Sequence, residues 1–584
     1  MVGKVGTDTL GNPAEQRRPA KPIALVSMPT LSGRFPSFQL GLLKPFLERE
    51  GFSVQPFSLF MYFGTHVGWQ MNETLAEVWP SLVGEWIWTK AAFGERNRDK
   101  EYFEVFEQNL RTVCRMADCS LRDLRRIRDD AAPRFIDFCL DSIDWTRFGV
   151  VGFSLVFQQL LASLSLARAL KARHPSLPIV WGGNFPSLYP APVLNAPYID
   201  WAVRGQGEAT FVELLDVLDG TRDPRTVAGL CFRDADGTHV LGAERRWQGP
   251  DELPAPPYHK IRVADYLHPT FLGRRSGVYQ ASIGCPYGCK FCGVISVFGS
   301  RERQQAPART AEHLAFLARE HGMDSVHFYD NNFFVREDHA REIAERLTPL
   351  GLRWWCEARV DALVRFSDDT WRMLARAGLA MVFCGAESGS DAVLQRMNKG
   401  TTTAQILEVA ARSRAHGIVP EFSFVFGDPD DPAREIEHTL AFVRTLKRVN
   451  PAMELISYFY TPTPQRRGTY GDVDALTGTP TTLEEWTEPE WVAWMTHEDP
   501  RVPWLDRALK ARVEDFELVL KSRFPSVHDH RTAAWGKALG TLLARRRWER
   551  EDYGDPWALR TVRRWARREP DDTQAYGHLR APAT

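Results

Sequence analysis

Two long blocks of the sequence alternate short apolar runs with helical patterns, and no other feature constrains the fold as strongly. The first block spans about residues 20 to 220 and contains five strand-like runs, at residues 22–28, 54–60, 148–155, 177–181 and 199–203. Helical patterns at residues 37–50 and 158–173 fall between them. Such alternation predicts a parallel sheet covered by helices on both faces. Ligands of these sheets bind beyond the carboxyl ends of the strands.

The second block spans about residues 275 to 465 and contains six strand-like runs. These lie at residues 278–284, 325–330, 353–360, 380–386, 419–427 and 453–460. Helical patterns separate them, and two of these, at residues 309–321 and 404–416, carry apolar residues on one face and stop at a glycine. The sequence therefore predicts an α/β protein with two successive units of this kind.

Three of the nine cysteines are gathered in one short segment, Gly284-Cys285-Pro286-Tyr287-Gly288-Cys289-Lys290-Phe291-Cys292-Gly293. Random placement would produce this three-cysteine spacing roughly 0.002 times per chain. The odd number of cysteines and the size of the chain argue against a disulfide framework. The other six cysteines are scattered, and we expect them to be small buried hydrophobic side chains.

The glycines and the proline of this segment predict a tight loop that directs three thiolates to one centre. A structural zinc site usually has four protein ligands, often from two Cys-x-x-Cys pairs, and the sequence has no second pair. A thioredoxin-like site would leave the third cysteine without a role. Three thiolates at this spacing suit a [4Fe-4S] cluster in which one iron stays open.

The loop, including Phe291 before its last cysteine, resembles the cluster motif of radical S-adenosylmethionine (SAM) enzymes. The resemblance implies that Cys285, Cys289 and Cys292 bind the cluster and that the amino and carboxylate groups of SAM chelate the open iron. It also implies a partial (β/α)6 barrel for the second block. Because the loop follows the first strand, it is expected at the carboxyl-terminal mouth of that barrel.

Polar residues at the ends of the barrel strands are the candidate SAM contacts. By resemblance, Asp330 and Asn331 after the second strand lie near the methionyl amine, and Arg359 after the third strand pairs with the SAM carboxylate. Glu387 and Ser388 match a Gly-x-Glu-Ser pattern that contacts the ribose. For any single one of these residues, capping of a helix is the alternative interpretation.

The strand ends of the first block are rich in small and polar residues: Gly152, Ser154, Gly182, Gly183, Ser187, Gly205 and Glu208. Their order resembles the cobalamin-binding domain that precedes many radical SAM domains, and implies that these residues contact cobalamin. The Asp-x-His-x-x-Gly motif, whose histidine binds cobalt in many cobalamin proteins, does not occur. Its absence favours cobalamin without a protein histidine ligand, and also leaves open a degenerate domain that binds no corrin.

We therefore expect a tail at residues 1–20, a cobalamin-binding domain at 21–220 with a helical insertion at 62–144, a linker at 221–274, a radical SAM domain at 275–465 and a helical C-terminal domain at 466–584. Within the insertion, Leu82-Val83-Gly84-Glu85-Trp86-Ile87-Trp88 resembles a segment of radical SAM C-methyltransferases that modify ribosomally made peptides. The alternative is that these tryptophans only pack a helix on the sheet.

Charge and hydropathy exclude several classes of protein. Lys plus Arg number 73 and Asp plus Glu 74, so the net charge of -1 gives no field that attracts nucleic acid or a membrane. Arginines and eight tryptophans near the C-terminus fit a helical domain better than a nucleic-acid surface. No apolar run reaches the roughly 20 residues of a membrane span. The polar N-terminus lacks a secretory hydrophobic region, so we expect a cytoplasmic protein.

Together the resemblances imply an enzyme that uses SAM, a [4Fe-4S] cluster and cobalamin, with ferredoxin or flavodoxin as electron donor. The leading hypothesis is transfer of a methyl group from SAM, via methylcobalamin, to an unactivated carbon of a natural-product or peptide substrate. An sp³ carbon has neither a lone pair nor an acidic proton, so the cofactors must supply the hard chemistry. The alternative is a cobalamin-dependent radical SAM cyclase, oxidative or rearrangement enzyme without methyl transfer.

Overall fold

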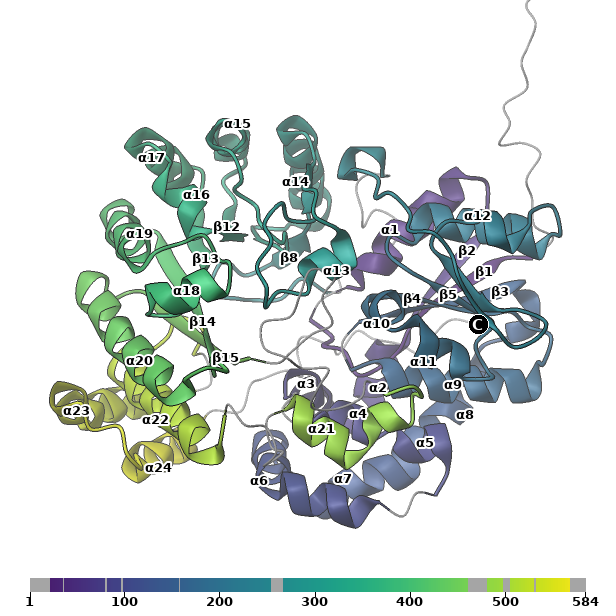
Figure 1. Ribbon diagram of the computed structural model, residues 1–584, viewed down its shortest axis with the longest axis horizontal. Helices are drawn as coiled ribbons and strands as arrows, with labels where there is room; N and C mark the ends of the chain where they lie inside the picture. The colour runs from purple at the N-terminus through teal and green to yellow at the C-terminus, as the bar shows by residue number, and fades with distance from the viewer. Residues whose placement is uncertain are drawn as a thin grey trace, which may run out of the picture.

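The computed structural model describes residues 21–567, apart from residues 35, 79–80, 96–97, 157, 254–265, 461–479, 497–504 and 530–531. Two α/β units lie beside each other, and helices near the C-terminus pack against both (Figure 1). The expected α/β fold, with a doubly wound sheet, a partial barrel and a helical C-terminal region, is confirmed. The predicted tail at residues 1–20 lies outside the described residues.

The first sheet has seven strands in the order β2-β1-β3-β4-β5-β6-β7. Their bounds are β1 Ile23–Ser27, β2 Val54–Ser58, β3 Val150–Leu155, β4 Ile179–Gly183, β5 Trp201–Val203, β6 Leu230–Arg233 and β7 His239–Leu241. The first five strands pair in parallel, as predicted. The last two are antiparallel and continue the sheet into residues 221–274, which we expected to be a linker. Two strands this short carry little periodic signal.

Residues of the interior strand β1 alternate between the two faces of the sheet. Ile23 and Leu25 pack under α1 (Phe38–Arg49) and α12 (Glu208–Leu218). Ala24 and Val26 belong to a second core shared with α9 (Leu160–Arg173) and the insertion. The sheet is therefore covered on both faces, and its carboxyl edge is the free site for a ligand.

The insertion after β2 is helical. Its helices are α2 Leu59–Val67, α3 Trp69–Glu77, α4 Val83–Trp86, α5 Thr89–Phe93, α6 Asp99–Ala117, α7 Leu121–Arg126 and α8 Ala132–Ser142, with a π-helical turn at Ile127–Ala131. Trp86 stacks on Tyr102, with ring centroids 5.1 Å apart, and Trp88 is fully buried. The buried Glu85 carboxylate accepts hydrogen bonds from the backbone N–H groups of Leu160 and Leu161, at 2.9 and 2.8 Å. The tryptophan-rich segment thus packs on the sheet and caps α9.

The second sheet has six parallel strands in the order β15-β14-β13-β12-β11-β8 and curves into a partial barrel (Figure 1). Their bounds are β8 Ser276–Tyr279, β11 Ser325–Phe328, β12 Arg353–Ala358, β13 Leu379–Glu387, β14 Val419–Phe426 and β15 Glu454–Phe459. The outer helices include α14 Pro307–His321, α15 Glu337–Leu347, α17 Asp368–Arg376, α19 Thr403–His416 and α20 Pro432–Val449. On β12, Trp354 and Cys356 face these helices, so Trp355 and Glu357 face the interior.

The first barrel strand ends earlier than predicted. We expected it to reach Gly284, but β8 ends at Tyr279, and β9 (Ser282–Ile283) pairs with β10 (Arg303–Gln304) in a separate antiparallel ribbon. The chain leaves the barrel here because the backbone N–H of Ala281 donates to the carboxylate of Asp330, at 3.0 Å.

The C-terminal helices contact both units. Helix α21 (Pro489–Met495) and Trp486 join the core of the insertion. Helix α22 (Arg507–Arg523) packs against α20, and α23 (Ala534–Arg550) and α24 (Trp557–Trp565) pack against α22. Between α22 and α23, Val527 N–H donates to Glu454 and His528 contacts Glu421, both at 3.0 Å. Since both carboxylates lie near the amino ends of their strands, this segment closes the barrel at the end opposite its mouth.

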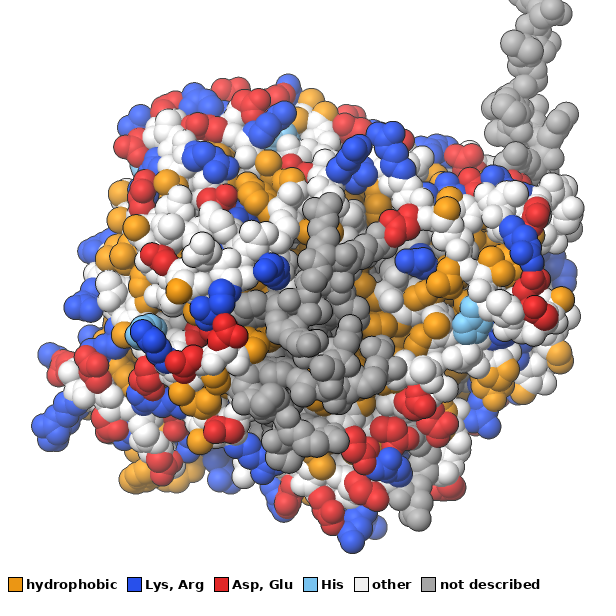
Figure 2. All heavy atoms as spheres, viewed as in Figure 1, with side chains coloured by type: hydrophobic (Ala, Val, Ile, Leu, Met, Phe, Trp, Pro, Cys, Tyr) orange, Lys and Arg blue, Asp and Glu red, His pale blue; other side chains and the backbone are white. Residues whose placement is uncertain are grey.

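Acidic and basic side chains are interspersed over the visible face of the molecule (Figure 2). Of the helices in the described residues, none combines the length and the apolarity that a membrane span requires.

Candidate active site

The three clustered cysteines lie in a loop that follows β9 at the mouth of the barrel. Gly284, at the start of the loop, has φ +84°, and a Cβ there would collide with the carbonyl oxygen of Arg301, so this position requires glycine. Two hydrogen bonds fix the loop to the segment after helix α18 (Asp391–Arg396). Lys290 N–H donates to the carbonyl of Met397 at 3.0 Å, and the Asn398 side chain donates to the carbonyl of Gly288 at 2.7 Å.

A buried cation lies against the cysteine loop. One guanidinium nitrogen of Arg359 is 3.3 Å from Cys289 Sγ, and the guanidinium stacks 3.7 Å from the centroid of the Tyr287 ring. Asp361 accepts from Arg359 Nε at 2.8 Å and holds it in place. The residue predicted to meet a carboxylate is therefore at the cysteine loop, where it stabilises negative charge on sulfur.

The three thiols are close enough to affect one another. Burial raises the pKa of Cys292, and the neighbouring thiols of Cys289 and Cys285 raise it further. Among the described residues, no three His, Cys, Asp or Glu side chains are gathered tightly enough for a single metal ion. A four-iron cluster spreads its thiolate ligands over different irons. The chemistry of the donor set, three thiols beside a fixed cation, fits such a cluster.

Glu387 forms a buried ion pair at the mouth of the barrel. Lys399 Nζ is 2.6 Å from Glu387 Oε1, and both side chains are 7% exposed. A Cβ at Gly385 would collide with both charged groups, so this glycine makes room for the pair. Lys399 also lies 5.8 Å from the ring centroid of Phe291, in the cysteine loop. The pair therefore connects the end of β13 to that loop.

The remaining predicted SAM contacts divide between two environments. Asp330 is fully buried, accepts from Ala281 N–H, and has a pKa that burial raises to about 7. Asn331 lines a cavity described below, and both amide atoms of the buried Asn332 have no hydrogen-bond partner. The Ser388 hydroxyl lies 3.3 Å from Glu435 Oε1, on the helix side of the sheet. The structure thus gathers Arg359, Glu387 and Phe291 around the cysteine loop, and turns Ser388 away.

A cavity of about 530 Å³ lies at the carboxyl edge of the first sheet. All seven residues predicted there from strand ends line it, namely Gly152, Ser154, Gly182, Gly183, Ser187, Gly205 and Glu208. The Ser187 hydroxyl joins two strand-end loops, because it accepts from Gly205 N–H at 3.0 Å and donates to the Gly183 carbonyl at 2.6 Å. A parallel sheet brings these distant segments together because its carboxyl ends share one edge.

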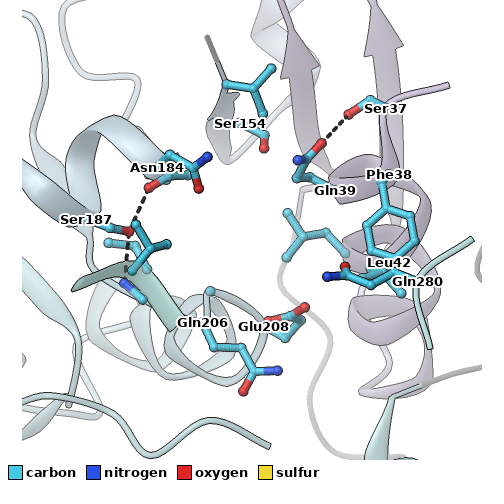
Figure 3. A pocket seen from close by; sticks show the side chains of 18 of the residues that line it. Ser37, Phe38, Gln39, Leu42, Ser154, Asn184, Ser187, Gln206, Glu208 and Gln280 are labelled. Carbon is cyan, nitrogen blue, oxygen red and sulfur yellow. Dashed lines mark hydrogen bonds between the residues drawn. The ribbon is translucent and has the colours of Figure 1, made fainter. Parts of the chain in front are cut away.

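The cavity also reaches the barrel. Its lining includes Tyr279, Gln280, Tyr329 and Asn331 from barrel strand ends, and Phe298 at the end of α13 (Val294–Phe298), just after the cysteine loop. Polar side chains from Ser154, Asn184, Ser187, Gln206 and Glu208 lie on one side, and Ser37, Gln39 and Gln280 on the other (Figure 3). The space between the two units is thus a single chamber with apolar walls and a few polar groups, which is typical of cofactor sites.

Two of the glycines that line this cavity leave space open for a ligand. A Cβ at Gly182 would meet only Val203, at 3.8 Å, and one at Gly207 also only Val203, at 3.8 Å. Nothing in the protein excludes side chains there, so their absence keeps space open on the cavity side. No histidine is among the lining residues in the part of the chain that the structure describes.

Several site residues were not predicted from the sequence. Ser37 and Gln39 at the start of α1, with Trp247 and Gln280, line the cavity, and Lys399 and Asn398 support the cysteine loop. The contribution of α1 to the cavity could have been predicted from the sequence, because this helix is the next element after the first strand. Residues 397–399 could not have been predicted to support the cysteine loop, because their position depends on how the chain folds back toward that loop after α18.

Comparisons with known proteins agree with this arrangement. Residues 279–443 match the model of the radical SAM superfamily, and residues 110–215 match the model of the B12 binding domain. An uncharacterized methyltransferase of Pyrococcus horikoshii is 29% identical over 300 residues, which cover 51% of this chain and 64% of that protein. The anaerobic magnesium-protoporphyrin IX monomethyl ester cyclase of Synechocystis is 31% identical over 261 residues, covering 43% of this chain and 50% of that protein. The chain thus spans less than two thirds of the length of these relatives.

Among solved structures, the radical S-adenosylmethionine methyltransferase TsrM from Kitasatospora setae, with cobalamin and a [4Fe-4S] cluster bound, has a TM-score of 0.53 and 16% sequence identity. The match covers 76% of each chain. At this identity the likeness establishes a common fold that extends over both α/β units.

Proposed function

We propose that this chain, which belongs to the cobalamin-dependent radical SAM enzymes, transfers a methyl group from SAM to an unactivated carbon of a natural-product or peptide substrate. The observation that carries the proposal is the single chamber between the two sheets. One wall is formed by the residues predicted to contact cobalamin, and the other by barrel residues next to the cysteine loop. A methyl carrier and a radical source can therefore act on one substrate without its leaving the protein.

When bound, the cluster and SAM supply a carbon radical, and cobalamin supplies the methyl group. The chain itself positions these groups and keeps water away. Cys285, Cys289 and Cys292 would hold the cluster, and the rigid Arg359 would orient the SAM carboxylate. Glu387, held by Lys399, would accept from the ribose. The small residues at the ends of β3, β4 and β5 would let the corrin approach the backbone.

Methyl transfer is favoured by the name of the Pyrococcus relative and by the shared fold with a methyltransferase. Cyclisation without methyl transfer is the second candidate, because the Synechocystis cyclase is 31% identical over the matched region. We also propose the domain boundaries given above, except that β6 and β7 extend the first domain to Leu241. We further propose a cytoplasmic location, and ferredoxin or flavodoxin as electron donor. These proposals rest on the family resemblance.

The test is anaerobic. The protein is reconstituted with iron, sulfide and hydroxocobalamin, reduced, and given SAM with a deuterated methyl group. We expect S-adenosylhomocysteine to form together with deuterated methyl on the extracted corrin. Formation of 5′-deoxyadenosine without either product would contradict methyl transfer and favour the cyclase. A Cys289→Ala variant is the control, because it should lose 5′-deoxyadenosine formation.

A further inference from the structure

Three glutamates lie in one register row inside the barrel, and one of them differs from the other two. Glu357, Phe383, Glu421 and Glu454 occupy one register row across β12, β13, β14 and β15. Glu421 accepts from Trp355 Nε1 at 3.0 Å and contacts His528, and Glu454 accepts from Val527 N–H. Within the described residues, the side chain of Glu357 has no hydrogen bond or salt bridge.

The charged groups around Glu357 do not supply a counterion for its carboxylate. Asp330 and Glu421 are its electrostatic neighbours, and both are acidic. Within the described residues no cation is among these neighbours, and the cations at the mouth, Lys399 and Arg359, pair with Glu387 and Asp361. Burial and these two carboxylates raise the pKa of Glu357 to about 8. A partly buried carboxylate without a counterion is costly, and a cationic ligand would remove that cost.

Aromatic rings stand beside this carboxylate. The rings of Tyr329 and Trp355 are 5.9 Å apart, and His327 lies 6.2 and 5.7 Å from them, with its Nε2 buried and unpartnered. Trp355 shares the inner face of β12 with Glu357, because the two residues are two positions apart. Carboxylates and aromatic faces together recognise organic cations.

One member of this group, Tyr329, reaches the chamber between the sheets. Tyr329 is 46% exposed and lines that chamber, and it follows β11 in register with Glu357. Arg359 and Glu387, which surround the cysteine loop, lie closer to the mouth. A group held at Glu357 is therefore placed deeper in the barrel than Arg359 and Glu387, beside the Tyr329 ring that lines the chamber.

We propose that Glu357, with the rings of Tyr329 and Trp355, binds a cationic nitrogen of the substrate, such as an ammonium, guanidinium or imidazolium group. The proposal rests on the proposed function, and it narrows the substrate to a compound with a basic nitrogen. Glu357 acts as a specificity-determining residue, because a neutral or anionic compound would leave its carboxylate unpaired.

The test measures binding to the reconstituted holoenzyme in the presence of SAM. The probes are 3-phenylpropylamine, the near-isosteric 3-phenylpropan-1-ol, and 3-phenylpropanoate. We expect the amine to bind at least about tenfold more tightly than the alcohol, and the acid to bind more weakly than either. Glu357→Gln should abolish the preference and leave the affinity for the alcohol unchanged.

The matched control is Glu454→Gln, which changes a carboxylate of the same register row that already has a partner, and it should keep the preference. Equal binding of amine and alcohol by the wild-type protein would overturn the proposal, even if the Glu357 variant failed to fold. A Glu357→Gln variant that keeps the preference would overturn it too. So would an equal loss of SAM affinity in that variant, since it would assign Glu357 to SAM.

Failure of the proposed function is recorded separately in the same preparation, as the absence of S-adenosylhomocysteine and of label on the corrin. A preparation that forms both products but shows no preference for the amine would refute only the substrate class.

Discussion

Among single residues, Glu387 and Lys399 tolerate substitution poorly, because they form a buried ion pair at the site. Removal of one partner leaves the other charge buried and uncompensated, which costs about 3–5 kcal/mol. We therefore expect Lys399→Met to lower the free energy of unfolding by this amount, measured by urea unfolding. The double variant Glu387→Gln/Lys399→Met should recover most of the loss. A single variant that unfolds like the wild-type protein would contradict the pairing.

Single residues also show what sequence reasoning could and could not predict. The cysteine loop was predictable because glycine, proline and cysteine specify it locally. Lys399 was not, because its role depends on a contact made after α18 returns to the loop. Ser388 was placed at the mouth by its motif, yet the register shift between Gly385 and Glu387 turns its hydroxyl toward α20.

At the scale of elements, the Glu85 carboxylate caps the N-terminus of α9 from within the insertion. Burial raises its pKa from 4.5 to about 7. Between these pH values the native state binds more protons than the unfolded state, so the free energy of unfolding falls as pH rises. Ionisation of Glu85 over this pH range lowers the free energy of unfolding by an amount on the order of 3 kcal/mol.

We expect Glu85→Gln to reduce the loss of stability between pH 5 and pH 8, measured by urea unfolding at each pH. Glu104→Gln, on the exposed side of α6, serves as control and should keep the wild-type slope. An unchanged slope in Glu85→Gln would show that this carboxylate is charged throughout the range.

The order of elements was largely predictable, because each long strand and helix carries its own periodicity. The hairpin of β6 and β7 and the ribbon of β9 and β10 were not predicted. Strands of two to four residues show too little alternation, and their pairing is set by neighbours distant in sequence.

At the scale of the whole molecule, the chamber between the two sheets should depend on the small side chains of its wall. Gly182→Leu would extend a side chain from a position where a Cβ meets only Val203, at 3.8 Å. After gel filtration, we expect the variant to retain at least about tenfold less cobalamin than the wild-type protein, while its iron content stays unchanged. Ala235→Leu, at an exposed turn of the same sheet, should retain both. Equal retention in the two variants would place the corrin elsewhere.

The positions of iron and cobalt would show whether the chamber between the two sheets is the cobalamin site. Crystals of the reconstituted protein would be measured at the absorption edges of iron and cobalt, so that anomalous density identifies each metal. We expect iron at Cys285, Cys289 and Cys292, and cobalt in the chamber between the ends of β3, β4 and β5 and the Tyr329 side of the barrel. Iron at the cysteines with cobalt outside this chamber, or no cobalt at all, would contradict it.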